Sequence, residues 1–332
     1  MHQDSVPQTV RDTGLRPPDF SGDRPARVVV AMSTYQGERF VAEQVHSILG
    51  QLPPDGRLFV RDDGSTDRTT ERIESIADPR ISLVRGTNIG FARSFFALLE
   101  MLPAEADLVM LSDQDDVWLP GRIDRAAQQM CGREGPTLYC SRLELVDEAL
   151  RPLGISSPWP RGPSFANALA ENIVTGCTVA LNRAALGLVL RLGDPAAIHF
   201  HDWWMYLVIS AFGTVIADPV PTVLYRQHGG NVVGRGSGVR RYLVNLQFIR
   251  RKSWVHIMFS QIENFRSVHA DKLAPEQRRL LDRVFDPRSA AAVARLVLQP
   301  TRYRQAFVDD VLLRVLVLAE LALGRGLLPA RE

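Results

Sequence analysis

The sequence predicts an α/β fold with a mostly parallel β-sheet, helices on both faces, and a helical appendage on the C-terminal side. Three observations support this class. Between residues 27 and 150, short apolar β-branched runs alternate with segments whose apolar residues recur at helical spacing, which is typical of a parallel sheet covered by helices. Polar turn residues follow the apolar runs. After residue 236 the remaining periodicity is helical.

The elements of the first half can be assigned in order. "RVVVAM" (27–32) predicts a buried strand, and "FVAEQVHSILGQL" (40–52) predicts a helix from the spacing of its apolar residues. Pro120 is expected at the first position of a later helix. By the same criteria we expect strands at 57–60, 81–86, 107–111 and 137–146, and helices ending near 77 and spanning 88–102.

The second half has a mixed pattern up to residue 235. We expect a strand at 175–182, a mostly apolar helix at 201–213 and a strand at 222–231 that runs into a glycine-rich loop. The segments 239–259 and 309–328 predict helices. A basic and aromatic cluster in the first of them indicates either a contact with a membrane surface or a solvated helix face; its members are Arg240, Arg241, Arg250, Arg251, Lys252, Tyr242, Phe248 and Trp254.

Composition limits the class of protein. The 332 residues are 45% hydrophobic and carry a net charge of +2, which argues against a dedicated nucleic-acid binder. Three cysteines without metal-type spacing suit a reducing compartment, and no run of 18 uncharged apolar residues predicts a membrane span. We therefore expect a cytoplasmic location. The polar, proline-containing residues 1–26 are expected to form a flexible leader, 27–235 the main domain and 236–332 a C-terminal helical region.

Three carboxylates follow the apolar strand at 107–111. Asp113, Asp115 and Asp116 stand within "LSDQDDVW", and like charges this close are tolerated when a cation lies between them. Mg²⁺ or Mn²⁺ prefers such oxygen ligands and often completes its shell with substrate phosphates. Two other interpretations remain: a capped turn, and a haloacid-dehalogenase-like phosphatase motif. The latter motif normally ends the first strand, whereas three predicted strands precede it here.

Four polar loops are expected at the same edge of the sheet. "STYQGE", "DDGSTD", "NIG" and "SDQDD" each follow a predicted strand. Because ligands of open α/β sheets bind beyond the carboxyl ends of the strands, we expect these loops to form one rim.

Taken together, the motifs resemble family 2 inverting nucleotide-sugar glycosyltransferases, which have the Rossmann-like GT-A fold. The matching stretches are "MSTYQGERFVAEQVHSIL", "VRDDGSTDRT", "NIGFARSF", "MLSDQDDVWLPGRI", "TGCTVALNR" and "HDWW", in the order of the family. "SDQDDVW", "HDWW" and "YRQHGGNVVG" are most similar to bacterial rhamnosyltransferases.

The resemblance implies roles for single residues. Residues 27–150 would form the nucleotide-sugar half and 151–235 the acceptor half. Asp202 matches the catalytic base, although His201 precedes it where the family usually has Glu. Trp203 and Trp204 could form an acceptor platform or pack in the core. The nucleotide-sugar site would comprise Ser33, Tyr35, Glu38, Asp62, Asp63, Asn88, Asp113, Asp116 and Arg226, and the Mg²⁺ or Mn²⁺ site Asp115, Asp113 and His228.

The implied activity is transfer of one sugar, such as L-rhamnose from dTDP-L-rhamnose or a sugar from a UDP donor, to a hydroxyl of a saccharide acceptor. A lipid-linked precursor of a cell-envelope polysaccharide such as O-antigen fits this activity, on the inner face of the cytoplasmic membrane. The processive-synthase signature Gln-x-x-Arg-Trp is absent, so single additions are expected. The alternatives are a non-catalytic nucleotide-sugar-binding scaffold and the phosphatase.

Overall fold

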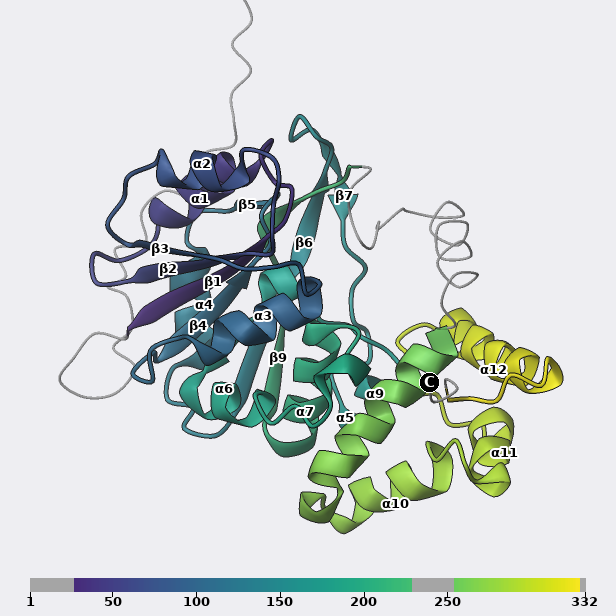
Figure 1. Cartoon of the computed structure of the whole chain (residues 1–332). Coiled ribbons are helices and arrows are strands. Elements are labelled where there is room, and N and C mark those ends of the chain that lie inside the picture. Colours follow the sequence, from purple (N-terminus) through teal and green to yellow (C-terminus); the bar gives the residue numbers. More distant parts are fainter. Residues whose placement is uncertain (1–26, 229–253, 329–332) are drawn as a thin grey trace, which may run out of the picture.

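The computed structural model describes residues 27–228 and 254–328. The predicted leader, the boundary at 235/236 and nearly all of the basic cluster lie outside these ranges. Figure 1 shows a sheet covered by helices. The last helices of the chain, α9–α12, form a further layer beside it. The α/β class with a C-terminal helical part is therefore confirmed.

One nine-stranded sheet forms the centre of the molecule, with the order β3-β2-β1-β4-β8-β6-β9-β5 and β7 paired to β6. The strands are β1 (Val28–Thr34), β2 (Arg57–Asp62), β3 (Ile81–Arg85), β4 (Leu108–Ser112), β5 (Val117–Trp118), β6 (Thr137–Val146), β7 (Pro152–Ile155), β8 (Ala180–Asn182) and β9 (Thr214–Arg226).

Strand direction differs between the two halves of the sheet. β3, β2, β1 and β4 run parallel, as predicted. β8 is antiparallel to both β4 and β6, and β9 is parallel to β6 but antiparallel to β5. The second half is thus mixed. The parallel half alone gathers strand ends at one rim.

The helices between the strands are α1 (Val41–Leu49), α2 (Thr69–Glu74), α3 (Phe91–Glu100), α4 (Arg122–Met130), α5 (Phe165–Ala168), α6 (Arg183–Val189) and α7 (His201–Phe212). The C-terminal layer contains α9 (Trp254–His269), α10 (Pro275–Val284), α11 (Ala290–Leu298) and α12 (Phe307–Ala322). Among the described residues, no helix has both the length and the hydropathy to cross a membrane.

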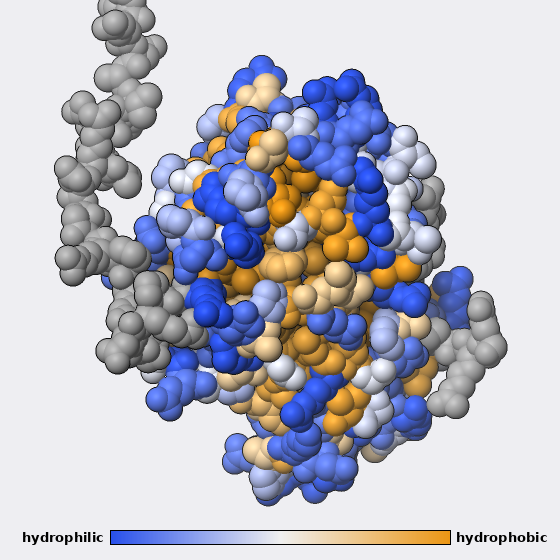
Figure 2. All heavy atoms as spheres, turned by 60° about the vertical axis from the view of Figure 1, so that its left-hand side comes forward, coloured by the Kyte–Doolittle hydropathy of each residue, from blue (hydrophilic) through white to orange (hydrophobic). Residues whose placement is uncertain are grey.

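Alternating side chains of the strands divide the core into two parts. Val28, Val30 and Met32 pack with α1 and α4, whereas Val29 and Ala31 pack with α3, α7 and the C-terminal helices. Figure 2 shows that apolar residues also form a band between hydrophilic borders on one face.

Several element predictions need correction. β9 begins at Thr214 rather than 222, and a 3-10 turn at Gly176–Thr178 replaces the start of the predicted strand at 175–182. Pro120 lies two residues before α4 instead of at its first position, because Gly121 takes a left-handed conformation with φ of 78° and acts as the N-cap.

Candidate active site

The rim predicted from the parallel half of the sheet carries three of the polar loops in contact with one another. Gln114 connects two of them: its Oε1 accepts from the backbone N–H of Tyr35 and its Nε2 donates to the carbonyl of Tyr35, each over 2.8 Å. The loop after β2 joins through Gln36, whose backbone N–H donates to Ser65 Oγ over 2.9 Å. The loops after β1, β2 and β4 therefore form one hydrogen-bonded unit.

The aspartate loop (residues 113–116) is the acidic part of this unit. Asp116 is fully buried; its Oδ1 accepts from the backbone N–H of Arg226 over 3.1 Å, while Oδ2 is buried without a hydrogen-bond partner. Ligand atoms of Asp113, Asp116 and Cys177 lie within 4.8 Å of one another. Asp115 pairs instead with His228, whose Nε2 lies 2.8 Å from Oδ2 of Asp115.

Burial and mutual repulsion perturb these carboxyls. Burial, then Asp115 and Asp202, raise the pKa of Asp113 to about 8. Burial, then the carboxylates of Asp115 and Asp113, hold the pKa of Asp116 well above its usual range. A bound divalent cation would relieve this repulsion, and the carboxylate oxygens of the loop are ligands of the kind that Mg²⁺ or Mn²⁺ prefers.

A buried arginine behind the loop was missed by sequence reasoning. Arg122 opens α4, and its Nη atoms donate to Thr222 Oγ1 over 3.0 Å and to the carbonyl of Cys177 over 2.7 Å. Its guanidinium also lies over the ring of Trp118. Burial lowers the pKa of Arg122 to about 10, while the charges of Asp116 and Asp113 act to raise it. The carboxylates thus face a fixed internal cation, which no local pattern in the sequence indicated.

Arg226, predicted to contact the donor diphosphate, has a different position. Its side chain is 2% exposed. Nε donates to the carbonyl of Asp115 over 2.9 Å, and the two Nη atoms donate to the carbonyl of Glu148 and to Oε2 of Glu43, each over 2.5 Å. The guanidinium lies over the ring of Phe40. All three nitrogens are committed to protein partners, so Arg226 positions the aspartate loop and is not placed as a diphosphate ligand.

The two aspartates at the end of β2 are also engaged. Asp62 accepts from Thr34 Oγ1 and from the backbone and hydroxyl of Ser65, which fixes the turn. Asp63 is 2% exposed; its Oδ1 accepts from Arg61 Nη1 over 2.6 Å and its carboxylate also accepts from the backbone N–H groups of Ile89 and Gly90. Asp63 thereby joins the loops after β2 and β3.

The remaining residues that were predicted to bind the nucleotide sugar lie on the same rim. Ser33 Oγ lies 2.6 Å from Ser94 Oγ, Tyr35 is 47% exposed, and Asn88 is exposed in the loop after β3. Oε2 of Glu38 accepts from the backbone N–H of Arg68 over 3.2 Å at the start of α2. Tyr35 and Asn88 therefore remain open to a nucleotide, while Glu38 fixes the turn before α2.

Asp202 reaches the site from the opposite side, at the N-terminal end of α7. Its Oδ2 accepts from the backbone N–H of Gly176 over 3.1 Å, and its charge contributes to the raised pKa of Asp113. The neighbouring His201 is buried and stacks on Phe95, with ring centroids 4.1 Å apart. Burial lowers the pKa of His201, which favours the neutral imidazole in the residue before Asp202.

The acceptor-platform prediction for Trp203 and Trp204 is wrong. Both indoles are buried, at 1% and 0% exposure. Nε1 of Trp203 donates to the carbonyl of Ala168, and Nε1 of Trp204 to that of Val189. The two side chains belong to the core between α7 and the C-terminal helices, which was the other interpretation of "HDWW".

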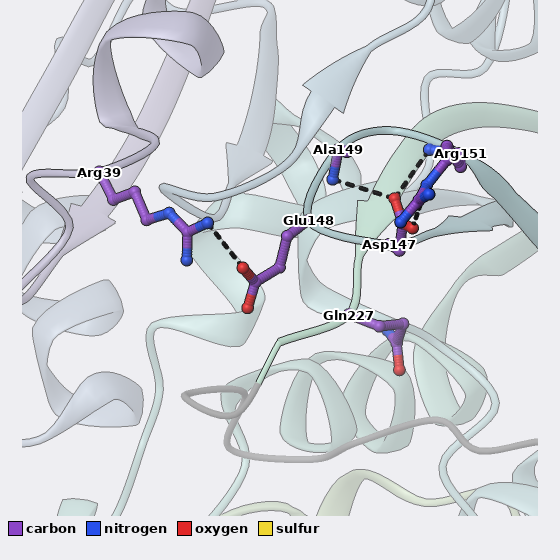
Figure 3. Close-up of a pocket in the computed structure, with 6 residues that line it drawn as sticks. All are labelled: Arg39, Asp147, Glu148, Ala149, Arg151 and Gln227. Carbon is purple, nitrogen blue, oxygen red and sulfur yellow. Dashed lines mark hydrogen bonds and ion pairs between the residues drawn. The ribbon is translucent and has the colours of Figure 1, made fainter.

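A hollow of about 430 Å³ opens at the turn between β6 and β7. Figure 3 shows Arg39 and Glu148 reaching toward each other across it, with an Nη2–Oε2 distance of 2.6 Å. The carbonyl of Glu148 is also the one that accepts from Arg226, so a wall of the hollow is attached to the group that holds the loop. Its lining consists of Arg39, Asp147, Glu148, Ala149, Arg151 and Gln227.

The chain is similar to known proteins in sequence and in fold. Residues 29–186 match the family model described as glycosyl transferase family 2. The chain is 27% identical over 253 residues to a dTDP-rhamnosyl transferase of Shigella flexneri, an alignment that covers 70% of this chain and 83% of the relative. It is 24% identical over 189 residues to the Escherichia coli UDP-Glc:α-D-GlcNAc-diphosphoundecaprenol β-1,3-glucosyltransferase, covering 55% of this chain and 69% of that protein.

The fold is similar to that of S. aureus TarS in complex with UDP-GlcNAc, with a TM-score of 0.52 and 15% identity over 90% of this chain and 92% of that one. The predicted strand-helix order, the rim of polar loops and the aspartate loop all lie within the matched region. Residues 29–186 thus match the glycosyl transferase family 2 model, and the fold of the described chain is the GT-A fold.

Proposed function

We propose that this glycosyltransferase is an inverting, metal-dependent enzyme that moves one sugar from a nucleotide diphosphate to a hydroxyl of a saccharide acceptor. One observation carries the proposal. Asp202 accepts a hydrogen bond from the backbone N–H of Gly176 over 3.1 Å, and the ligand atoms of the next residue, Cys177, and of Asp113 and Asp116 lie within 4.8 Å of one another. This supports one site for a candidate proton acceptor and the donor-side carboxylates, although they come from distant segments.

The residues suggest the order of events. Asp202 takes the proton of the acceptor hydroxyl, which requires hydrogen-bond reach to it. The acceptor oxygen attacks the anomeric carbon on the side opposite to the diphosphate, and the bond from that carbon to the diphosphate oxygen breaks. One displacement of this kind inverts the anomeric centre.

The aspartate loop would hold the cation through Asp115, with Asp113 and His228 as further ligands. When bound, Mg²⁺ or Mn²⁺ would act as a Lewis acid for the charge on the leaving diphosphate. Ser33, Tyr35 and Asn88 would contact the nucleotide, and Asp116 would keep the loop near the sugar.

The proposed donor is dTDP-L-rhamnose and the proposed acceptor a lipid-linked saccharide of cell-envelope polysaccharide synthesis, such as O-antigen. The similarity to a dTDP-rhamnosyl transferase and to an enzyme acting on a diphosphoundecaprenol acceptor supports these choices. A cytoplasmic location, peripheral on the inner face of the membrane, follows from that acceptor. Nucleic acid is not a proposed partner.

A panel of nucleotide sugars tests the donor and the metal. A ligand that binds only the native state raises the melting temperature, so dTDP-rhamnose with Mn²⁺ should give a larger shift than UDP-glucose or UDP-GlcNAc, and the shift should shrink with EDTA. An equal shift for all donors would refute the rhamnose assignment. Donor binding without acceptor-dependent release of nucleotide diphosphate would identify a non-catalytic scaffold instead.

A further inference from the structure

In α12, the last helix of the described chain, the charged side chains face the protein and apolar side chains are exposed. The charged residues of α12 are Asp309, Asp310, Arg314 and Glu320, and all of them are turned toward the protein. Asp310 is 3% exposed and accepts from the backbone N–H of Tyr303 over 2.7 Å; Arg314 pairs with it at 2.9 Å. The other side of α12 is apolar and exposed. Among the described elements, α12 packs chiefly on α9 and α11, at the edge of the C-terminal layer (Figure 1).

The exposed residues on this face have a coiled-coil spacing. Val308, Val311, Val315, Leu318 and Ala322 recur at alternating intervals of three and four residues, which places them in one stripe. The first four are 60%, 42%, 53% and 50% exposed. Phe307, Leu321 and Leu323 flank the stripe and are also exposed. A stripe with this period is suited to pack against another helix.

We propose that α12 pairs with α12 of a second copy of this chain, so that the protein is a dimer joined along this stripe. Two features favour a second copy over other occupants. The stripe carries no charge, so pairing with an identical stripe brings no like charges together. Helices that lie on anionic lipid surfaces carry Lys or Arg around their apolar face, and the cation of α12, Arg314, is held in an internal ion pair.

The exposed area is adequate for such an interface. The stripe and its flanks leave on the order of 600 Å² of apolar surface per chain, most of the roughly 800 Å² that each partner of a stable complex buries. A largest apolar patch of a few hundred Å² is usual for a monomer and often functional. Pairing about a two-fold axis would place Val315, at the middle of the stripe, next to Val315 of the second copy.

Sedimentation velocity of the full chain tests the proposal. The wild type should sediment with the mass of two chains, and the double variant Val315→Glu, Leu318→Glu should raise the dimer dissociation constant at least ~10-fold, because burying unpaired carboxylates is unfavourable. The control Met101→Glu changes a residue that is 48% exposed at the end of α3 and should leave the dimer intact. A monomeric wild type, or a double variant that dimerises as well as the wild type, would overturn the proposal.

A second measurement does not depend on a disruptive substitution. In a Cys131→Ser background, which removes the exposed thiol, Val315→Cys should form an intermolecular disulfide under a mild oxidant, whereas Met101→Cys should not. Equal cross-linking of both variants would contradict the pairing. Binding of the monomer to phosphatidylglycerol vesicles, lost in the Glu double variant, would assign the stripe to a lipid surface instead.

Discussion

The carbonyl oxygen of Asp115 accepts a hydrogen bond from Nε of Arg226 over 2.9 Å, while the backbone N–H of Arg226 donates to Oδ1 of Asp116 over 3.1 Å. The last residue of β9 thus holds two residues of the aspartate loop. The remaining guanidinium nitrogens reach Glu43 and Glu148, so segments far apart in sequence meet at one buried cation.

Replacing Arg226 with Met should therefore reduce both stability and transfer activity. Glu43 is half exposed, so the expected loss is that of hydrogen bonds to a charged group, about 1.5–3 kcal/mol, and the released loop should lower kcat at least ~10-fold. Urea unfolding and initial rates measure the two effects. Arg39→Met is the control: its exposed ion pair should contribute no more than ~1 kcal/mol, and a similar loss in both variants would contradict the positioning role.

Asp202→Asn should lower kcat by about 10²–10⁴-fold, the usual contribution of a general base, with little change in donor affinity. Calorimetry with the nucleotide sugar and a steady-state transfer assay separate binding from chemistry. Asp194→Asn is a matched substitution at an exposed turn, where the amide oxygen can still accept from Ala196 N–H. Wild-type turnover in Asp202→Asn would exclude this residue as the base.

Asp115→Asn should weaken Mn²⁺ binding, because it removes a charged ligand beside His228. Electron paramagnetic resonance of free Mn²⁺ provides a direct titration that does not require turnover, and we expect at least ~10-fold weaker affinity. Asp147→Asn, in the turn after β6, should bind Mn²⁺ as the wild type does. If Asp113→Asn rather than Asp115→Asn abolishes binding, the chief ligand has been misassigned.

The metal-free protein should lose stability as the pH rises from about 4 to about 8. The pKa of Asp113 is raised from 3.8 to about 8 in the folded protein, so the folded state retains a proton that the unfolded state has released. Stability falls with pH wherever the native state binds more protons. Urea unfolding in EDTA across this range should show the decline, which Asp113→Asn should flatten; a stability that rises over this window in the wild type would refute it.

Trp204→Ala should destabilise the fold without a specific effect on the acceptor. The indole is fully buried, and truncating such a side chain costs about 3–5 kcal/mol. The free energy of urea unfolding measures this loss. If the variant remains as stable as the wild type and instead raises the KM for the acceptor, the platform interpretation would be restored.

Local patterns were sufficient to predict the parallel half of the sheet and its rim. β-branched runs and helical spacing identify β1 to β4, and the rule for strand ends then brings the loops after β1, β2 and β4 together. The antiparallel insertion of β8 and the two-residue strand β5 have no such signal, because their pairing depends on distant partners. For the same reason β9 was predicted to start eight residues too late: its first half is defined by pairing with β6 and carries little alternation of its own.

Residue types in the motifs predicted which side chains belong to the site, and the burial of some of these side chains in the structure changed the roles assigned to them. Asp115, His228 and Asp202 lie at the rim or face it, as expected. Arg226 was expected to meet a phosphate, but its commitment to Glu43 and Glu148 depends on long-range packing that a motif does not contain. Arg122 and Gln114 were missed for the same reason, since an arginine at a helix start and a glutamine in a loop are ordinary in sequence. "HDWW" shows the converse case, in which the acid is accessible and the aromatic residues after it are core.

The amide of Gln114 has a further consequence. Gln114 makes both hydrogen bonds with the backbone of Tyr35. The loop after β1, on which a base would rest, and the aspartate loop therefore cannot shift independently. A cation that orders the aspartate loop should therefore also order the loop that carries Tyr35. By thermodynamic linkage, a nucleotide bound at Tyr35 should raise the affinity for the cation by the same factor. Nucleotide and cation should therefore reinforce each other's binding through the protein itself, beyond any direct contact between them, and Gln114→Ala should uncouple the two.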